Sequence, residues 1–332
     1  MALIPQNKKH HNQIIAGTVG RNKGHAFEKE ISETINALSL ERICNLPLIA
    51  VGDVVFNGNP AILLLGYIFS DQVIDCKKLS SITAFWLGGL ATSGKGDVLK
   101  LANGENIKSS KSDLLLRLKY KDGKMKDIGV SVKTCNNKTP TNDQLFFTTA
   151  SAFCKLLRAN NIEVSDLAER AMKMFCGDNG FRPIDMVDVS KRKSDPDRWF
   201  WEELPIKEKN ELEKMFKEKQ NSISEVLFKK AYPNDPFPPD YVFHQTKKFE
   251  NIDQVESAIF SINRLLELSK KYLGFDLRPY TVKKGRFRGD PNIHSAPRFG
   301  IIQMQRGGQK QHPTQLQFNL KAGYFYHLKD LS

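Results

Sequence analysis

The chain has no apolar run long enough to cross a membrane. Its most hydrophobic stretch, residues 60–69 (PAILLLGYIF), is far shorter than the roughly 20 residues that a bilayer-spanning helix needs. The first residues, MALIPQNKKHHNQ, contain no apolar segment followed by a small-residue cleavage site, so we expect no signal peptide. These absences predict a cytoplasmic protein without a membrane partner.

Cysteine is scarce and forms no recognisable pairs in the sequence. The five cysteines are an odd number, are widely spaced and include no CxxC motif. This distribution argues against a cysteine zinc site and against a disulfide framework, and it favours a reducing compartment. The cysteines stand at positions 44, 76, 135, 154 and 176.

Acidic residues are too few to balance the basic ones. The 37 Asp and Glu face 50 Lys and Arg, which gives a net charge of +13 and a pI near 9.4. A charge of this size indicates a polyanionic partner rather than a particular fold. Because no long basic amphipathic helix stands out, nucleic acid is a better candidate than a membrane surface.

We expect a short N-terminal arm followed by one domain. Residues 1–23 are polar and basic, and we expect a flexible arm there. Helical spacing begins at Gly24, where the apolar residues 27, 31, 35 and 38 form one stripe and Glu28 lies at its edge. Residues 24–332 are expected to form a single domain.

Several other segments have a readable pattern. Residues 145–161, 208–219 and 252–273 have the composition or spacing of helices, and the proline-rich residues 232–242 predict a loop. The last 50 residues are basic and strand-like. Residues 43–92 are apolar and dotted with glycine, without a clean period, and their structure stays open.

The segment SDLLLRLKYKDGKMKDIGVSVKT, residues 112–134, predicts a β-hairpin whose register can be derived. Its two apolar faces coincide only if Leu116 pairs with Ile128 and Leu114 pairs with Val130. The turn is then residues 121–123, and Gly123 can take a positive φ.

This register places Asp113 opposite Ser131, on the same face as Lys133. Opposed Cβ atoms are about 5 Å apart and diagonal ones about 7 to 8 Å apart, so the three side chains can surround one divalent ion. Mg²⁺ needs only a carboxylate or two from the protein, together with water and substrate phosphate. Taken alone, the same residues equally fit a salt-bridged, solvated strand face, so both interpretations stay open here.

Two further segments carry a resemblance. Glu28 on an early helix, Asp113 on one strand and residues 131–133 on the next resemble the PD-(D/E)xK nuclease core. PRFGIIQMQRGGQKQHPTQLQFNL (297–320) is similar to the end of small type II restriction endonucleases of the MspI-like group, and DRWFWEELPIKEKNELEKMF (197–216) resembles a mid-chain segment of them. The resemblance implies an α/β fold with a mixed central sheet flanked by helices.

The resemblance also implies roles for matching residues. Asp113 would be the principal Mg²⁺ ligand, the Val132 carbonyl a further ligand and Lys133 the catalytic lysine, while Glu28 would bind the metal directly or through water. Ser131 stands where the superfamily usually has an acidic residue. The MspI-like group also departs there, typically with an amide, so Ser131 is compatible with activity but weakens the charge of the metal site.

The C-terminal segment has residue types suited to reading DNA. Leu316, Phe318 and Leu320 alternate with amide residues, so one strand face is apolar and the other carries amides. Glutamine pairs well with adenine and arginine with guanine in the major groove. A solvated, amide-rich hairpin is the alternative. The residues expected to bind DNA are Gln144, Lys283, Lys284, Arg286, Arg288, Arg298, Gln303, Gln305, Arg306, Lys310 and Gln317.

The resemblance, together with the basic net charge, implies a prokaryotic type II restriction endonuclease that uses Mg²⁺ to cut double-stranded DNA at a short, palindromic, G/C-containing site, leaving 5′-phosphates. Residues 24–332 would then be a single nuclease domain, with a catalytic hairpin near 112–134 and a DNA-recognition region near 282–320. A cognate methyltransferase is expected in the host without a stable complex, and the enzyme is expected to be a monomer or weak dimer. The alternatives are a PD-(D/E)xK repair nuclease without sequence specificity and a DNA-binding protein that never cuts. An HNH nuclease is disfavoured because the seven histidines form no such cluster; His294 and His312 are expected to make phosphate or structural contacts.

Overall fold

The computed structural model describes residues 8–51, 55–90, 94–101, 103–134, 143–190, 192, 194–245, 255–272, 274–281, 292–306 and 315–321. The chain divides into two compact units. Unit 1 comprises Met1–Thr141, Lys229–Leu265 and Ala322–Ser332, and unit 2 comprises Asn142–Phe228 and Leu266–Lys321. Each unit has its own sheet and is described by itself.

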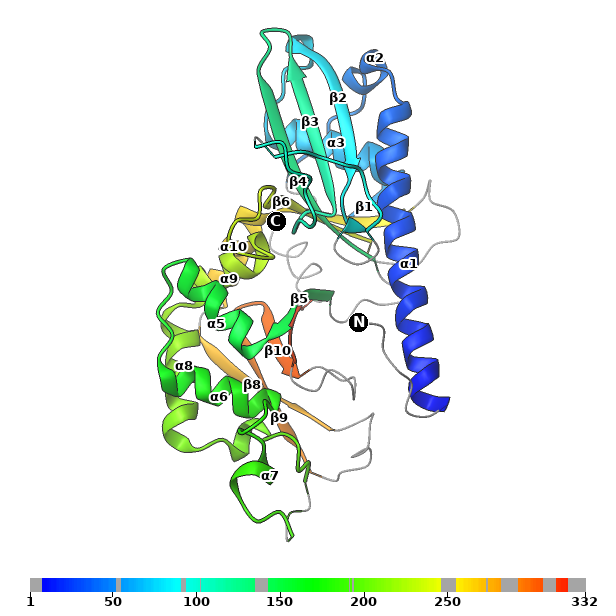
Figure 1. Ribbon diagram of the computed structural model, residues 1–332. Coiled ribbons are helices and arrows are strands. Elements are labelled where there is room, and N and C mark those ends of the chain that lie inside the picture. Colours follow the sequence, from blue (N-terminus) through cyan, green and yellow to red (C-terminus); the bar gives the residue numbers. More distant parts are fainter. Residues whose placement is uncertain are drawn as a thin grey trace. The chain divides into compact units, whose positions relative to one another are not determined.

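Unit 1 is built on a six-stranded mixed sheet with the order β1-β7-β6-β4-β3-β2. The pairing of β4 with β6 is parallel, and the other pairings are antiparallel. Helices accompany the sheet, as Figure 1 shows, so the expected mixed sheet with flanking helices is present. The strands are β1 (Val55–Gly58), β2 (Leu79–Trp86), β3 (Leu114–Tyr120), β4 (Met125–Lys133), β6 (Pro239–Gln245) and β7 (Val255–Ser261).

The helices of unit 1 are α1 (Lys8–Ala37), α2 (Leu40–Cys44) and α3 (Pro60–Asp71). Ile31 and Ile35 of α1 share one buried core with apolar residues of α3 and of the sheet. The side chain of Asn36 also forms hydrogen bonds to the backbone of the edge strand β2. Its Nδ2 donates to the Ala84 carbonyl at 2.8 Å, and its Oδ1 accepts from the Ala84 N–H at 2.8 Å. These hydrogen bonds attach α1 to the edge strand β2.

Helix α1 begins at Lys8, sixteen residues before the start expected from the sequence. Residues 8–23 were expected to form a flexible arm, because they carry no apolar stripe that would reveal a helix. The spacing of apolar residues also gave no indication of helix α3. Its continuous apolar run is buried almost all round and therefore has no polar face, while Asn59 caps its first turn and Pro60 follows at the first helical position.

The hairpin register is confirmed. Leu114 pairs with Val130 and Leu116 with Ile128. The turn is residues 121–123, closed by a hydrogen bond from the Tyr120 N–H to the Lys124 carbonyl at 2.8 Å, and Gly123 has a φ of 85°. The leucines and valines of the inner face are buried, so a slip by one residue would place them outside the core.

Unit 2 contains a five-stranded antiparallel sheet with the order β5-β11-β10-β9-β8. Its strands are β5 (Asp143–Thr149), β8 (Phe275–Tyr280), β9 (His294–Phe299), β10 (Ile302–Arg306) and β11 (Gln315–Leu320). The helices are α5 (Ala150–Ala159), α6 (Asp166–Cys176), α7 (Pro183–Met186), α8 (Ile206–Glu218), α9 (Gln220–Lys229) and α10 (Ile262–Lys271). The short 3-10 helices are η1 (Cys76–Lys78) in unit 1 and η2 (Trp201–Glu203) in unit 2.

Three expected elements differ from the structure. Residues 145–161, expected as one helix, form the end of β5 and then α5, and residues 255–271, within a second expected helix, form β7 and then α10. In both cases a strand runs directly into a helix, and a sheet partner rather than local spacing sets the boundary. The expected loop at 232–242 ends in β6, which begins at Pro239, a position where a strand tolerates proline.

The expectation of unpaired cysteines is wrong for one pair. Cys44 at the end of α2 and Cys76 in η1 form a disulfide, while Cys154 and Cys176 are buried free thiols. Cys135 lies outside the described residues. Pairing of two cysteines 32 residues apart leaves no local sequence signal. Among the residues that the structure describes, no helix has the length and apolar character needed to span a membrane.

Candidate active site

Glu28 and Trp86 form one side of a polar cluster in unit 1. The Glu28 side chain on α1 is buried, and its Oε2 accepts a hydrogen bond from the Trp86 Nε1–H at 3.0 Å. Gly88, two residues after Trp86, leaves room for this carboxylate, because a Cβ there would lie 2.0 Å from Glu28 Oε2. The end of β2 therefore both holds and accommodates the carboxylate.

Asp113 is fixed by its backbone immediately before β3. Its N–H donates to the Val130 carbonyl at 2.9 Å, and its carbonyl accepts from the N–H groups of Leu87 and Gly88 at 2.8 and 3.0 Å. The residue thus joins the segment after β2 to the hairpin. These hydrogen bonds fix the backbone position from which the Asp113 side chain projects.

The carboxylate of Asp113 meets the residues that the hairpin register predicts. Oδ2 accepts from the Ser131 hydroxyl at 3.2 Å, from the Val132 N–H at 2.7 Å and from Lys133 Nζ at 3.4 Å. Lys133 Nζ also donates to Ser131 Oγ at 2.8 Å and to the Val132 carbonyl at 3.2 Å. The Lys133 and Asp113 side chains keep 20% and 21% of their surface exposed, so solvent and a ligand can reach them.

The two carboxylates of the cluster influence each other electrically. The pKa of Glu28 is raised to about 8, mainly by burial and also by the negative charge of Asp113, while the Trp86 hydrogen bond and the Lys133 charge act in the opposite direction. A divalent cation is the ligand that would offset this repulsion. The available donors are carboxylate, hydroxyl and carbonyl oxygens, which suit Mg²⁺.

The protein offers only a few ligands for a metal at this place. Within the described residues, no three His, Cys, Asp or Glu side chains come together as a metal-binding group. Mg²⁺ is commonly held by one or two carboxylates, with water and substrate phosphate completing its shell. The carboxylates of Glu28 and Asp113 and the Val132 carbonyl are oxygen donors of the kind that such a site uses.

Lys111 is a member of the cluster that the sequence did not reveal. Burial lowers the pKa of Lys111 to about 7, with a smaller contribution from the positive charge of Lys133, whereas Asp113 and Asp235 raise it. Its backbone N–H donates to Asp235 Oδ2 at 2.7 Å. Lys111 precedes the strand, so the two-residue periodicity that places Ser131 and Lys133 says nothing about it.

The amide residues of the C-terminal segment lie on one face of the sheet in unit 2. Gln303 pairs with Asn319, Gln305 with Gln317, and Asn319 in turn with Gln144 on β5. Ile302, Met304, Leu316, Phe318 and Leu320 are buried and alternate with them. The expected separation into an apolar and an amide face is present, although Gln303 and Asn319 are themselves buried.

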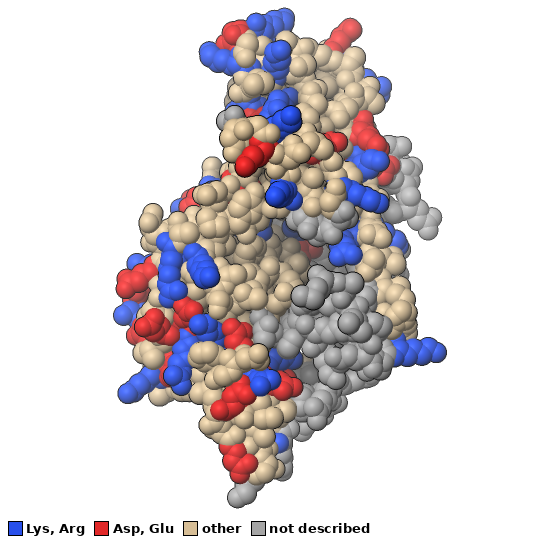
Figure 2. All heavy atoms as spheres, in the orientation of Figure 1, with Lys and Arg blue, Asp and Glu red and all other residues tan. Residues whose placement is uncertain are grey.

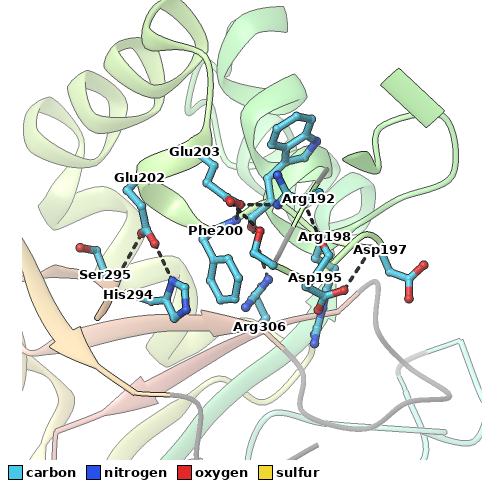
Figure 3. A network of polar contacts seen from close by, with 12 residues as sticks. Arg192, Asp195, Asp197, Arg198, Phe200, Glu202, Glu203, His294, Ser295 and Arg306 are labelled. Carbon is cyan, nitrogen blue, oxygen red and sulfur yellow. Dashed lines mark hydrogen bonds and ion pairs between the residues drawn. The ribbon is translucent and has the colours of Figure 1, made fainter. Parts of the chain in front are cut away.

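Arg306 does not join these amides. It pairs with Leu316 in the ladder and so lies on the apolar side of β10. Its guanidinium stands 4.2 Å from the Phe200 ring centroid and donates to the Trp199 carbonyl at 3.4 Å and the Tyr280 hydroxyl at 3.5 Å. Figure 3 shows Arg306 among the residues of this packed network.

His294 belongs to the same network. Its ring stacks on Phe200 with the centroids 3.4 Å apart, and its Nδ1 lies 2.6 Å from Glu202 Oε1. The Ser295 N–H donates to Glu202 Oε2 at 3.2 Å, as Figure 3 also shows. Of the two roles expected for His294, these contacts are structural.

The remaining expected DNA contacts are placed only in part. Arg298 pairs with Gln303 in the ladder and forms an ion pair with Asp276 at 2.8 Å. Gln144 is exposed. Outside the described residues lie Lys283, Lys284, Arg286, Arg288, Lys310 and His312.

Comparisons with known proteins give a likeness at the level of structure. No family model matches the chain, and no curated protein matches its sequence. Among solved structures, the chain is similar to restriction endonuclease MspI in complex with its cognate DNA, with 11% identity and a TM-score of 0.42. The match covers 77% of this chain and 76% of that one. At this identity and TM-score, the likeness supports no inference about this chain.

Proposed function

We propose that the protein is a Mg²⁺-dependent endonuclease that hydrolyses phosphodiester bonds of double-stranded DNA at a short specific site and leaves 5′-phosphates. The observation that carries the proposal is the meeting of Glu28, Asp113 and Lys133 at the base of the hairpin. The buried Glu28 carboxylate, with the Asp113 carboxylate and the Lys133 ammonium group partly open to solvent, suits a metal and a phosphate at the same point. The net charge of +13 favours a polyanionic substrate.

Glu28, Asp113 and the Val132 carbonyl would hold the metal. When bound there, Mg²⁺ would polarise the scissile phosphate and make water more acidic. The protein contributes a fixed Asp113 carboxylate, held by three hydrogen bonds to Oδ2. It also supplies Glu28, whose Oε2 is oriented by Trp86.

Lys133 would act on the substrate directly. Its ammonium group is held by Ser131 Oγ and the Val132 carbonyl, so it has a defined position beside Asp113. From there it would orient the attacking water and stabilise negative charge that develops on the phosphate. Ser131 would link Asp113 and Lys133, because its hydroxyl donates to Asp113 and accepts from Lys133.

Sequence would be read by the amide face in unit 2, with Gln144, Gln303, Gln305 and Gln317 and with Arg298 beside them. Each good amide or guanidinium contact to a base edge is worth roughly 1 to 3 kcal/mol of discrimination. The basic residues at 283–288 and Lys310 would add phosphate contacts. Because Arg306 faces the packed side of the sheet, we assign it to structure.

The experiment is a digest of unmethylated phage DNA with wild type and Lys133→Ala, each with Mg²⁺ or with EDTA. Lys126→Ala is the matched control, since Lys126 stands on the same strand and is exposed. Discrete fragments are expected from wild type and from Lys126→Ala with Mg²⁺, and cleavage by Lys133→Ala should fall by at least about 100-fold.

Other outcomes would select another function. Equal cutting by Lys133→Ala would overturn the site, and smeared or structure-dependent products would indicate a repair-type nuclease. Binding to DNA that is sensitive to salt, without any cleavage, would indicate a binding protein. A prokaryotic source, a separate companion methyltransferase, and a monomer or weak dimer remain part of the proposal.

A further inference from the structure

One face of α1 extends the candidate active site toward the N-terminus. Arg21, His25 and Glu28 follow one another at spacings of four and three residues, so their side chains project from the same side of the helix. Glu28 is the carboxylate of the site. Arg21 and His25 are therefore the side chains that a substrate would meet one and two turns further along the helix.

The contacts of His25 place it beside the site. Its ring centroid lies 6.1 Å from that of Trp86, the residue that donates to Glu28. Burial lowers the pKa of His25, Arg21 lowers it further and Asp113 raises it, so both charged groups act on this ring. His25 is therefore close enough to both Arg21 and Asp113 to be affected by their charges.

The helix also comes close to the end of β4 at this point. A Cβ built on Gly24 would lie 3.8 Å from Thr134 Oγ1 and 4.0 Å from Glu28 Oε1. Thr134 directly follows Lys133, the proposed catalytic lysine. The backbone of α1 at Gly24 therefore borders the cluster, and the adjacent Arg21 and His25 stand at its margin.

The charge of this part of α1 is of one sign. Residues 8–27 contain four Lys or Arg, three His and no acidic residue. Arg21 and Lys23 are exposed. Figure 2 shows basic side chains on the N-terminal part of α1, and acidic ones appear toward its C-terminal half. A solvated helix face normally mixes both signs, so this segment favours an anionic ligand.

We propose that Arg21 and His25 are positioning residues that bind a DNA phosphate adjacent to the scissile one. This inference rests on the proposed nuclease function. A guanidinium forms two parallel hydrogen bonds to a phosphate, and an imidazole N–H forms one. Contacts at this place would align the strand with the carboxylates without taking part in bond breaking.

The test measures DNA affinity and cleavage separately. Arg21→Ala, His25→Ala and the control Lys29→Ala are compared with wild type; Lys29 is exposed on the same helix and pairs with Glu33 at 3.4 Å. Binding of a DNA duplex is measured in EDTA over a series of salt concentrations. Cleavage is then followed with Mg²⁺ to obtain KM and kcat.

Arg21→Ala is expected to raise Kd about tenfold and to reduce the slope of log Kd against log salt by about one, as loss of one phosphate contact requires. His25→Ala should raise KM several-fold, with a smaller change in kcat. Arg21→Lys should retain the salt slope, and Lys29→Ala should match wild type. Circular dichroism of each variant checks that the exposed substitutions leave the fold intact.

The outcomes separate this inference from the proposed function. If wild type cuts DNA and both variants behave as Lys29→Ala does, the inference is overturned and the nuclease function stands. If wild type cuts no DNA but Arg21→Ala still loses affinity and salt slope, the nuclease function fails and the phosphate contact stands. If Arg21→Ala does not fold, Arg21→Lys decides, because an unchanged fold with a lost salt slope would contradict the proposal.

Discussion

Asp113 is the residue whose position could be derived most fully from the sequence. Side chains on a strand alternate between its two faces, so burying the leucines of the hairpin fixes which residues face Asp113. The structure places Ser131 Oγ and Lys133 Nζ within 3.4 Å of its carboxylate. Glu28 could be assigned to this cluster only through the family resemblance, since it lies on a helix far away in sequence.

Lys111, Trp86 and His25 could not be predicted from the sequence. Their membership of the cluster depends on how α1 crosses β2 and how the segment before β3 turns. Neither feature has a periodic signal. A lysine two residues before an aspartate, or a tryptophan at a strand end, is common in proteins without any site.

Glu28 gives a prediction about stability and pH. Its pKa is raised from 4.5 to about 8 in the folded protein, so its neutral form is favoured there. As pH rises from about 4.5 to above 8, the unfolded chain ionises first, and the folded state loses relative stability. In metal-free buffer, Glu28→Gln should lose less stability than wild type between pH 5 and pH 9, by about 4 kcal/mol.

The measurement is urea unfolding of both proteins at the two pH values in EDTA. Glutamine keeps an oxygen that can accept from Trp86 Nε1, so the hydrogen bond is preserved in the variant. Identical pH dependence of the two proteins would show that Glu28 is not buried beside Asp113 as described.

At the scale of elements, hairpins were easier to predict than junctions between a strand and a helix. The β3–β4 hairpin has alternation and a glycine turn, which together specify one register. In contrast, β5 runs directly into α5 and β7 directly into α10. Both junctions lie within apolar runs that also fit a helix. The first half of each run is a strand because β5 pairs with β11, and β7 pairs with β1 and β6.

The two faces of β10 predict different effects for neighbouring residues. Arg306→Ala removes a guanidinium packed 4.2 Å from the Phe200 ring centroid and should destabilise the protein by about 2 kcal/mol. Gln305→Ala, on the amide face, should change stability by less than about 0.5 kcal/mol but relax the choice of cleavage site. Urea unfolding and sequencing of the cut ends measure the two effects.

A stable Arg306→Ala variant with altered cleavage sites would contradict this assignment, because it would make Arg306 a base-reading residue as the sequence implied. Loss of stability in Gln305→Ala would place that side chain in the packed side instead. The two substitutions serve as controls for each other, since they are adjacent on one strand.

At the scale of the whole molecule, the composition indicates a polyanionic partner but does not reveal the division into units. The chain passes between the units after residues 141, 228, 265 and 321. One of these boundaries falls inside α10, where no proline, glycine or change in composition marks it. Because each unit is made of separate stretches of the chain, linker composition cannot reveal where one unit ends and the other begins.

The disulfide between Cys44 and Cys76 likewise depends on the fold of the whole chain. It joins the end of α2 to the 3-10 helix before β2, two segments whose proximity follows from the packing of α1 against the sheet. Cysteine spacing alone could not indicate it.

The central claim is that Asp113 anchors a metal-dependent nuclease site. The most direct measurement is cleavage of plasmid DNA with Mg²⁺ by wild type, Asp113→Asn and the control Asp127→Asn, whose carboxylate lies on the same hairpin and pairs with Arg117 at 2.8 Å. Discrete fragments from wild type and Asp127→Asn, with cleavage by Asp113→Asn reduced at least about 100-fold, are predicted. Equal cleavage by Asp113→Asn and wild type would contradict the claim.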